Sequence, residues 1–214
     1  MRITLFIFSF LTAVSVYAQT NLKVGYTYFR PNLTELNRAF KTYNENNKEL
    51  IEGFGKTSAI SYLDLGVRLK VADALGFEFG GKFGQSGINK ATYASSTEKW
   101  SMRASELNGG LAVYFGDISV GGTLHRSNVA ITRNEPTTRK YPSLDESTYW
   151  AGSVHLQFEA ASGKSSISIR PYYQWAFSNL SFPNTAARLG YKGSSEGTPP
   201  GGFGLSVLIY NGKR

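Results

Sequence analysis

The chain has 214 residues, no cysteine, and 23 Lys and Arg residues against 15 Asp and Glu residues, which gives a formal net charge of +8. The lack of cysteine excludes a disulfide framework and a lipidated N-terminal cysteine. The positive charge is spread along the chain without a dense basic run, so we expect no nucleic-acid partner and favour anionic lipid as the partner of the basic residues.

The N-terminal segment has the pattern of an export signal. Met1 and Arg2 are followed by an apolar run over residues 3–16 and then by Tyr17 and Ala18. This run of about 14 residues is shorter than the roughly 20 that a membrane-spanning helix needs. We therefore expect residues 1–18 to be a signal peptide and residues 19–214 to form one domain. The alternative is a retained N-terminal anchor.

The rest of the chain has the two-residue period of β-strands. Between Leu22 and Tyr28 the even-numbered residues are apolar or aromatic, and the odd-numbered ones are small or polar. This alternation predicts a strand with one apolar and one polar face. The same pattern predicts eight strands in all, over residues 22–28, 63–71, 75–83, 106–115, 118–124, 150–158, 166–177 and 203–209.

Three features favour a membrane barrel over a soluble sandwich or a lipocalin-like barrel. The connections at 72–74, 116–117 and 160–164 are short, and those at 30–56, 85–102, 131–147 and 178–201 are long. Several strands are long enough to cross a bilayer at a tilt. Aromatic residues gather near strand ends, as expected at lipid headgroups; they include Tyr26, Tyr28, Tyr114, Phe115, Tyr149, Trp150 and the segment 172–177. We predict an all-β fold, an eight-stranded antiparallel up-and-down transmembrane β-barrel with a short helix in the first long loop.

Eight alternating strands, three tight turns and four long loops resemble the small outer-membrane barrels of the outer membrane protein A and X type. The resemblance covers the whole chain after residue 18 and is architectural, without an invariant motif. It implies a bacterial outer-membrane location, chain termini in the periplasm, and a role in adhesion, surface integrity or shielding.

Strand parity also predicts the contents of the barrel interior. An eight-stranded barrel is just wide enough to be filled by side chains, so charged residues on the polar faces should pair with one another. The predicted interior network consists of Lys23, Asp64, Arg68, Lys70, Glu78, Lys82, Glu106 and Arg170. A packed polar core is the structural interpretation, and a narrow solute channel is the functional alternative.

The first long loop contains the predicted helix. Asn32 stands at a capping position, and Glu35 follows it by three residues. Leu33, Leu36, Phe40 and Tyr43 recur at spacings of three and four and so form one apolar face. We expect this face to pack over the barrel mouth or against its wall; the alternative is a contact with a partner or with the lipid surface.

One short motif raises the question of catalysis. His125-Arg126-Ser127-Asn128 is similar to the His-x-Ser-Asn stretch of outer-membrane lipid A deacylases, in which a histidine activates a serine. Strand parity turns His125 toward the interior, however, whereas such an enzyme needs its nucleophile at the lipid. We therefore predict no catalytic residue, cofactor or metal site, and keep a deacylase-like enzyme as the alternative.

The expected partners follow from the predicted location. They are outer-membrane lipid and, at the outer leaflet, lipopolysaccharide phosphates or a surface protein. Basic side chains available to phosphates are Arg126, Arg133, Arg139, Lys140, Arg188 and Lys192. We expect a monomer.

Overall fold

The computed structural model describes residues 19–133 and 142–212. The predicted signal peptide and two of the loop cations, Arg139 and Lys140, fall outside these residues. No helix among the described residues is long and apolar enough to span a membrane.

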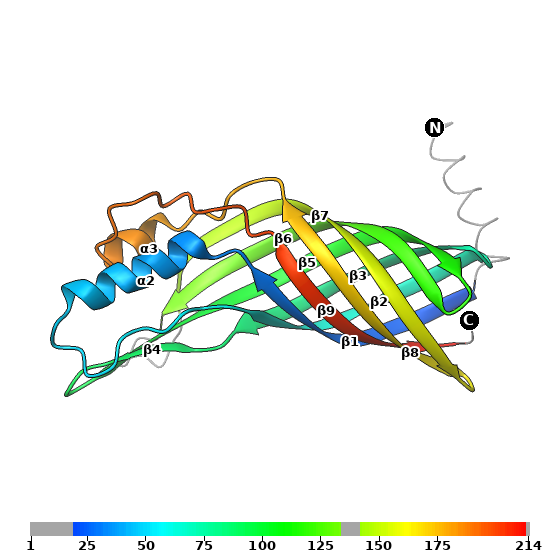
Figure 1. Ribbon diagram of the computed structural model, residues 1–214, viewed down its shortest axis with the longest axis horizontal. Coiled ribbons are helices and arrows are strands. Elements are labelled where there is room, and N and C mark those ends of the chain that lie inside the picture. Colours follow the sequence, from blue (N-terminus) through cyan, green and yellow to red (C-terminus); the bar gives the residue numbers. More distant parts are fainter. Residues whose placement is uncertain (1–18, 134–141, 213–214) are drawn as a thin grey trace.

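Eight strands form one closed antiparallel barrel in the order of the chain (Figure 1). They are β1 (Gln19–Pro31), β2 (Ile60–Ala72), β3 (Leu75–Ser86), β5 (Thr97–Phe115), β6 (Ile118–Arg133), β7 (Ser143–Ser162), β8 (Ser165–Ala176) and β9 (Gly202–Asn211). The pairing of β1 with β9 closes the barrel, with Tyr26 opposite Val207. A ninth strand, β4 (Asn89–Thr92), pairs with β5, forms one bridge to Glu52 through Thr92, and stands outside the ring.

The two ends of the barrel differ. Residues 73–74, 116–117 and 163–164 connect strands by tight turns at one end. The long connections lie at the other end, with the helices α2 (Thr34–Asn46) and α3 (Pro183–Arg188) and the strand β4 (Figure 1). We call these the short-turn end and the long-loop end. β1 begins and β9 finishes at the short-turn end.

The alternating pattern makes the outer face apolar and the inner face polar. Leu107 and Phe203 are 66% and 71% exposed, whereas Arg68 and Ser206 are 0% and 2% exposed. The arrangement is the reverse of a soluble barrel, in which the apolar face would be buried. Burying this outer surface requires hydrocarbon, so the apolar band is a lipid-facing surface.

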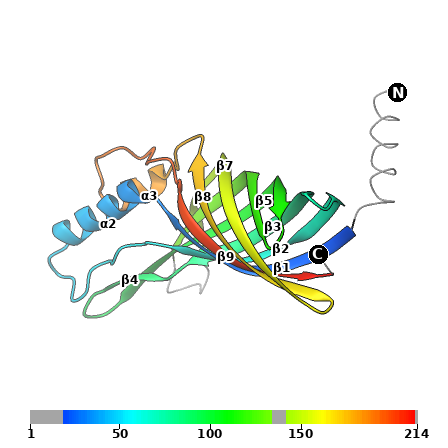
Figure 2. The same cartoon turned by 45° about the vertical axis from the view of Figure 1, so that its right-hand side comes forward.

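Strands extend into two of the predicted loops. Residues 85–102 contain the end of β3, all of β4 and the first residues of β5, and the strands β6 and β7 extend into the loop predicted at 131–147. β5 and β7 therefore have 19 and 20 residues, about twice the 9–11 that a bilayer-spanning strand needs. The surplus projects beyond the barrel at the long-loop end (Figure 2).

The aromatic residues at strand ends point in two directions, which corrects the predicted girdle. Tyr26, Tyr28, Trp150 and Trp175 face outward, but Tyr114, Tyr149 and Tyr172 are buried in the interior. The reason is strand parity: Tyr114 and Phe115 are neighbours, so only one of them can face lipid.

Candidate functional site

The interior is filled by ion pairs in successive layers. Nearest the short-turn end, Arg68 donates to both carboxylate oxygens of Glu159, with N···O distances of 2.6 and 3.0 Å. The guanidinium of Arg68 also lies 3.8 Å from the ring centroid of Tyr210. Glu159 accepts a further hydrogen bond from Ser166 at 2.5 Å. The Arg68 and Glu159 charges are thus paired with each other and supported by Tyr210 and Ser166.

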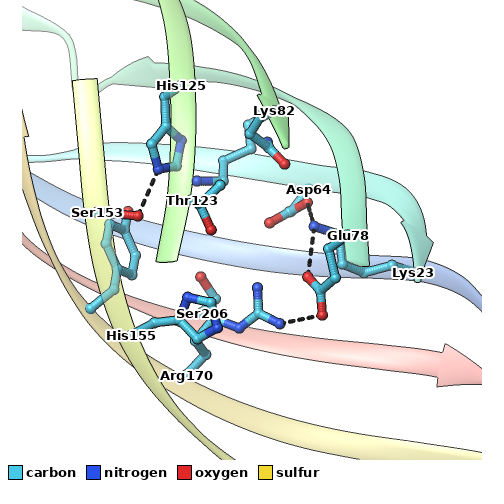
Figure 3. A pocket seen from close by; sticks show the side chains of 12 residues that line it. Lys23, Asp64, Glu78, Lys82, Thr123, His125, Ser153, His155, Arg170 and Ser206 are labelled. Atoms are coloured by element: carbon cyan, nitrogen blue, oxygen red, sulfur yellow. Dashed lines mark hydrogen bonds and ion pairs between the residues drawn. The ribbon is translucent and has the colours of Figure 1, made fainter. Parts of the chain in front are cut away.

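The middle layer is centred on Glu78. One of its oxygens accepts hydrogen bonds from Arg170 at 2.6 Å and from the Tyr210 hydroxyl at 2.9 Å. Lys23 forms ion pairs with Asp64, at 3.0 Å, and with Glu78, at 3.7 Å. Arg170 also donates to Gln157. Figure 3 shows Lys23 and Arg170 approaching the Glu78 carboxylate from two sides.

The third layer, nearer the long-loop end, contains Glu106. Its carboxylate pairs with Lys82 at 2.8 Å and contacts His125 Nδ1 at 2.7 Å. His125 Nε2 in turn lies 2.7 Å from the Ser153 hydroxyl (Figure 3). The Ser127 hydroxyl donates to the second oxygen of Glu106 at 3.2 Å.

Seven of the eight residues of the predicted interior network are buried in these layers; Lys70 is half-buried near the Tyr114 ring. Sequence reasoning missed Glu159, because the predicted strand ended at residue 158 and β7 continues to Ser162. It also missed Tyr210, whose parity with Leu208 and Ser206 gives the signal that could have found it. With Glu159 included, four deeply buried cations (Lys23, Arg68, Lys82, Arg170) face four described carboxylates (Asp64, Glu78, Glu106, Glu159).

The network leaves almost no empty space. A cavity of about 20 Å³ lies among Lys23, Glu78, His125, His155 and Arg170. This volume is close to the minimum that holds one water molecule. Within the described part of the chain His155 Nε2 and Asn108 Nδ2 have no hydrogen-bond partner, and both side chains line this cavity.

The motif at 125–128 does not form the serine–histidine pair that the deacylase-like alternative requires. Ser127 donates to Glu106, and the hydroxyl that contacts His125 belongs to Ser153 on the neighbouring strand. Glu106, His125, Ser127 and Ser153 are all buried inside the barrel, out of reach of a lipid substrate. Among the described residues no three His, Asp or Glu side chains are grouped to hold a metal ion.

The long-loop end is closed by a folded unit that we call the cap. It comprises α2, the segment 47–59, β4, the segment 177–201 with α3, and the ends of β5 to β7 that contact them. Leu33, Leu36 and Phe40 of the predicted helix face are at most 5% exposed, and Tyr43 packs at their edge. Phe40, Phe54 and Trp100 have ring centroids 5.0 to 6.2 Å apart, in tilted or edge-on geometry.

Two asparagines hold the first loop against its own helix. Asn37 and Asn44 lie seven residues apart, two turns of helix, and so share one face. Asn37 donates to the Thr57 carbonyl and accepts from the Thr57 amide at 3.0 and 2.9 Å. Asn44 makes the same pair of bonds with Phe54, both at 2.8 Å. The amide side chains therefore bind the segment 54–57 much as a neighbouring strand would.

The start of the helix differs from the prediction. The N-cap residue is Leu33, which makes no side-chain capping bond. Asn32 accepts from the backbone amide and the hydroxyl of Thr34 and so forms a local turn before the helix. Glu35 does not return to cap the helix, because its carboxylate binds Arg38 and the Tyr191 hydroxyl.

The last long connection, at 178–201, is part of the cap. Leu180, Phe182 and Leu189 are at most 3% exposed. The Asp145 carboxylate of β7 accepts from the backbone amides of Asn184 and Thr185 at the start of α3, at 3.0 and 2.6 Å. A six-residue helix has too little periodicity to be found in the sequence, and this capping group lies about 40 residues away.

Exposed cations lie at the edge of the apolar band that is nearer the long-loop end. Arg30 on β1, Arg103 on β5 and Arg126 on β6 face outward, each beyond the last large apolar residue of its strand on the long-loop side. Within residues 19–133 and 142–212 none of the three has an ion-pair partner. Outward cations at this level lie at the height of lipid phosphates when the band is in a bilayer.

Solved structures with this arrangement are known. Ail, the attachment invasion locus protein of Yersinia pestis, matches with 13% identity and a TM-score of 0.52 over 91% of this chain and 97% of Ail, in a complex with the heparin analogue sucrose octasulfate. A second Ail structure matches with 12% identity and a TM-score of 0.50, over 90% and 96% of the two chains. The outer membrane protease OmpT of Escherichia coli aligns at 10% identity with a TM-score of 0.38, over 92% and 96%.

The fold is that of the small outer-membrane β-barrels. At these identities the likeness to Ail concerns the fold alone. No protein-family model matches the sequence, and no curated protein matches it.

Proposed function

We propose that this chain is an integral protein of a bacterial outer membrane whose closed barrel displays the cap at the cell surface, where the cap makes the functional contacts. The observation that carries the proposal is the pairing of a filled interior with a cap that has its own hydrophobic core. Four buried charge pairs fill the described barrel interior, and the core around Trp100 covers its mouth. Such a molecule suits recognition better than transport.

The orientation follows from the same features. Small barrels of this class have short periplasmic turns and longer external loops, so the short-turn end is proposed to face the periplasm. We propose that residues 1–18 are the signal peptide that directs the chain there. The outward arginines then lie at the outer leaflet, where lipopolysaccharide phosphates are their proposed partners.

The two alternative functions receive less support. A solute channel needs an open lumen, and the cavity of about 20 Å³ is far below that. A lipid-cleaving enzyme needs a nucleophile at the lipid face, whereas Ser127 and Ser153 are both buried inside. We therefore propose a surface-interaction role without catalysis, with the protein acting as a monomer.

The test uses cells that display the intact protein. Immobilised heparin is the first probe, because Ail was solved with a heparin analogue. We expect displaying cells to be retained more than vector-only cells, and Trp100→Ala, which opens the core of the cap, to abolish the difference while heat-modifiable migration of the barrel persists. The purified protein should give no conductance in planar bilayers.

Retention equal to that of vector-only cells would contradict binding of polyanions by the cap. Stable single-channel conductance that changes in Arg68→Ala would contradict the closed barrel and favour a channel instead.

A further inference from the structure

A groove lies at the edge of the apolar band, on the side of the long-loop end. It has a volume of about 740 Å³ and lies between the start of α2, the segment 56–58 and the outer faces of β8 and β9 near their ends. One wall therefore belongs to the cap, and the floor belongs to the lipid-facing surface of the barrel. Figure 1 shows α2 following directly from the end of β1, beside β9.

The floor of the groove is aromatic. Tyr173 and Phe203 stack edge to face with ring centroids 4.8 Å apart, and Trp175 lies beside them in the lining. These side chains are 43%, 71% and 39% exposed. Trp and Tyr are the residues that occupy the headgroup level of a bilayer, where a ring can contact both acyl chain and polar group.

The charged lining of the groove has a single sign. Arg30 and Lys56 are the charged residues of its lining, and both are exposed. No carboxylate lines it. Neither has an ion-pair partner among the described residues. On the neighbouring surface of α2, by contrast, Arg38 pairs with Glu35 and Lys41 with Glu45. Two cations beside the side-chain amide of Asn32 are partners that a phosphate prefers.

We propose that this groove binds a phosphorylated lipid of the outer leaflet, with its phosphate on Arg30 and Lys56 and its apolar part over Tyr173, Trp175 and Phe203. A soluble polyanion could use the cations, but it would gain nothing from an aromatic floor that is continuous with the lipid-facing band. The inference rests on the proposed outer-membrane placement and adds a specific binding site to it.

The experiment is native mass spectrometry of the full-length mature protein in detergent, titrated with diphosphoryl lipid A and with its dephosphorylated counterpart. Arg30→Gln/Lys56→Gln removes both charges, and the control Lys48→Gln/Lys90→Gln removes two exposed cations of the cap that lie outside the groove. We expect the double variant to bind diphosphoryl lipid A at least about tenfold more weakly, and the control to stay within about twofold of the wild type. Trp175→Ala should also weaken lipid binding.

Three results would overturn the proposal. They are equal losses in Arg30→Gln/Lys56→Gln and in the control Lys48→Gln/Lys90→Gln, equal binding of the dephosphorylated lipid, or displacement of the lipid by sucrose octasulfate with no effect of Trp175→Ala. Heat-modifiable migration of each variant is recorded in parallel. A wild-type protein without it would contradict the membrane barrel itself, so failure of the placement is distinguished from failure of the groove.

Discussion

Replacing Glu159 with leucine removes the acceptor of the most deeply buried cation in the barrel. Arg68 is fully buried, and its two strongest contacts are the paired hydrogen bonds to Glu159 at 2.6 and 3.0 Å. Ser166 and Gln157 also lose their acceptor, at 2.5 and 3.0 Å. Breaking a buried ion pair by removing one partner costs about 3–5 kcal/mol, because the remaining charge stays buried without compensation.

The stacking of Arg68 on Tyr210 remains in this variant. A cation–π contact of a desolvated cation offsets at most on the order of 1–2 kcal/mol of the lost stability. We therefore expect Glu159→Leu to lower the free energy of unfolding by about 3 kcal/mol. The double variant Arg68→Leu/Glu159→Leu removes both charges and should recover most of that loss.

The assay is urea unfolding of the protein in phospholipid vesicles, followed by tryptophan fluorescence and by heat-modifiable migration. A loss below about 1 kcal/mol for Glu159→Leu would refute the reasoning, since an exposed pair behaves in that way. A double variant that is as unstable as the sum of the two single variants would also refute it.

Three further predictions concern packing and the cap. Gly204→Ala should destabilise the barrel by about 1–3 kcal/mol in the same assay, because an added Cβ would lie 2.1 Å from the Tyr172 ring; Gly122→Ala, where the nearest atom is 3.6 Å away, is the control. Asn44→Ala should open the segment 54–57 to limited proteolysis while the barrel stays heat-modifiable, because both of its bonds to Phe54 are lost; unchanged cleavage would contradict the clamp. Burial and the hydrogen bond to Tyr93 raise the pKa of Tyr43 well above its ordinary value. The folded cap therefore favours the protonated hydroxyl, so its stability should be intact below pH about 10 and fall as the pH rises beyond it; Tyr43→Phe should flatten that dependence in proteolysis measured against pH.

The barrel could be predicted from the sequence because the pattern that specifies each strand is local. A period of two assigns each strand residue to one face, so the inward positions of Lys23, Arg68 and Arg170 follow from their neighbours without knowledge of the whole fold. The same parity would have placed Tyr114, Tyr149 and Tyr172 inside, had the aromatic girdle not been judged from nearness to strand ends. Glu159 was missed for a different reason, namely a strand end placed a few residues too early.

The cap could not be predicted in the same way, because its contacts are distant in sequence. Asp145 caps α3 from another strand, Tyr191 donates to Glu35 at 2.5 Å, and Trp100 packs on Phe40. No local sequence pattern predicts such contacts. Within the described cap, the apolar face of α2 is the feature that a periodic pattern predicts. The groove at Arg30 and Lys56 likewise exists only once α2 is placed beside β8 and β9.

The most direct measurement of the central claim uses the absence of cysteine from the chain. Single cysteines at Leu65, Phe79 and Ile169, and at the inward Ser168 and Ser206, can each carry a nitroxide label in vesicles. The account predicts that labels at the first three positions collide freely with oxygen dissolved in the bilayer and little with a water-soluble nickel relaxant, and that labels at the two inward positions are protected from both. Labels at Leu65, Phe79 and Ile169 that are exposed to the nickel relaxant or immobilised in a common interior would contradict it.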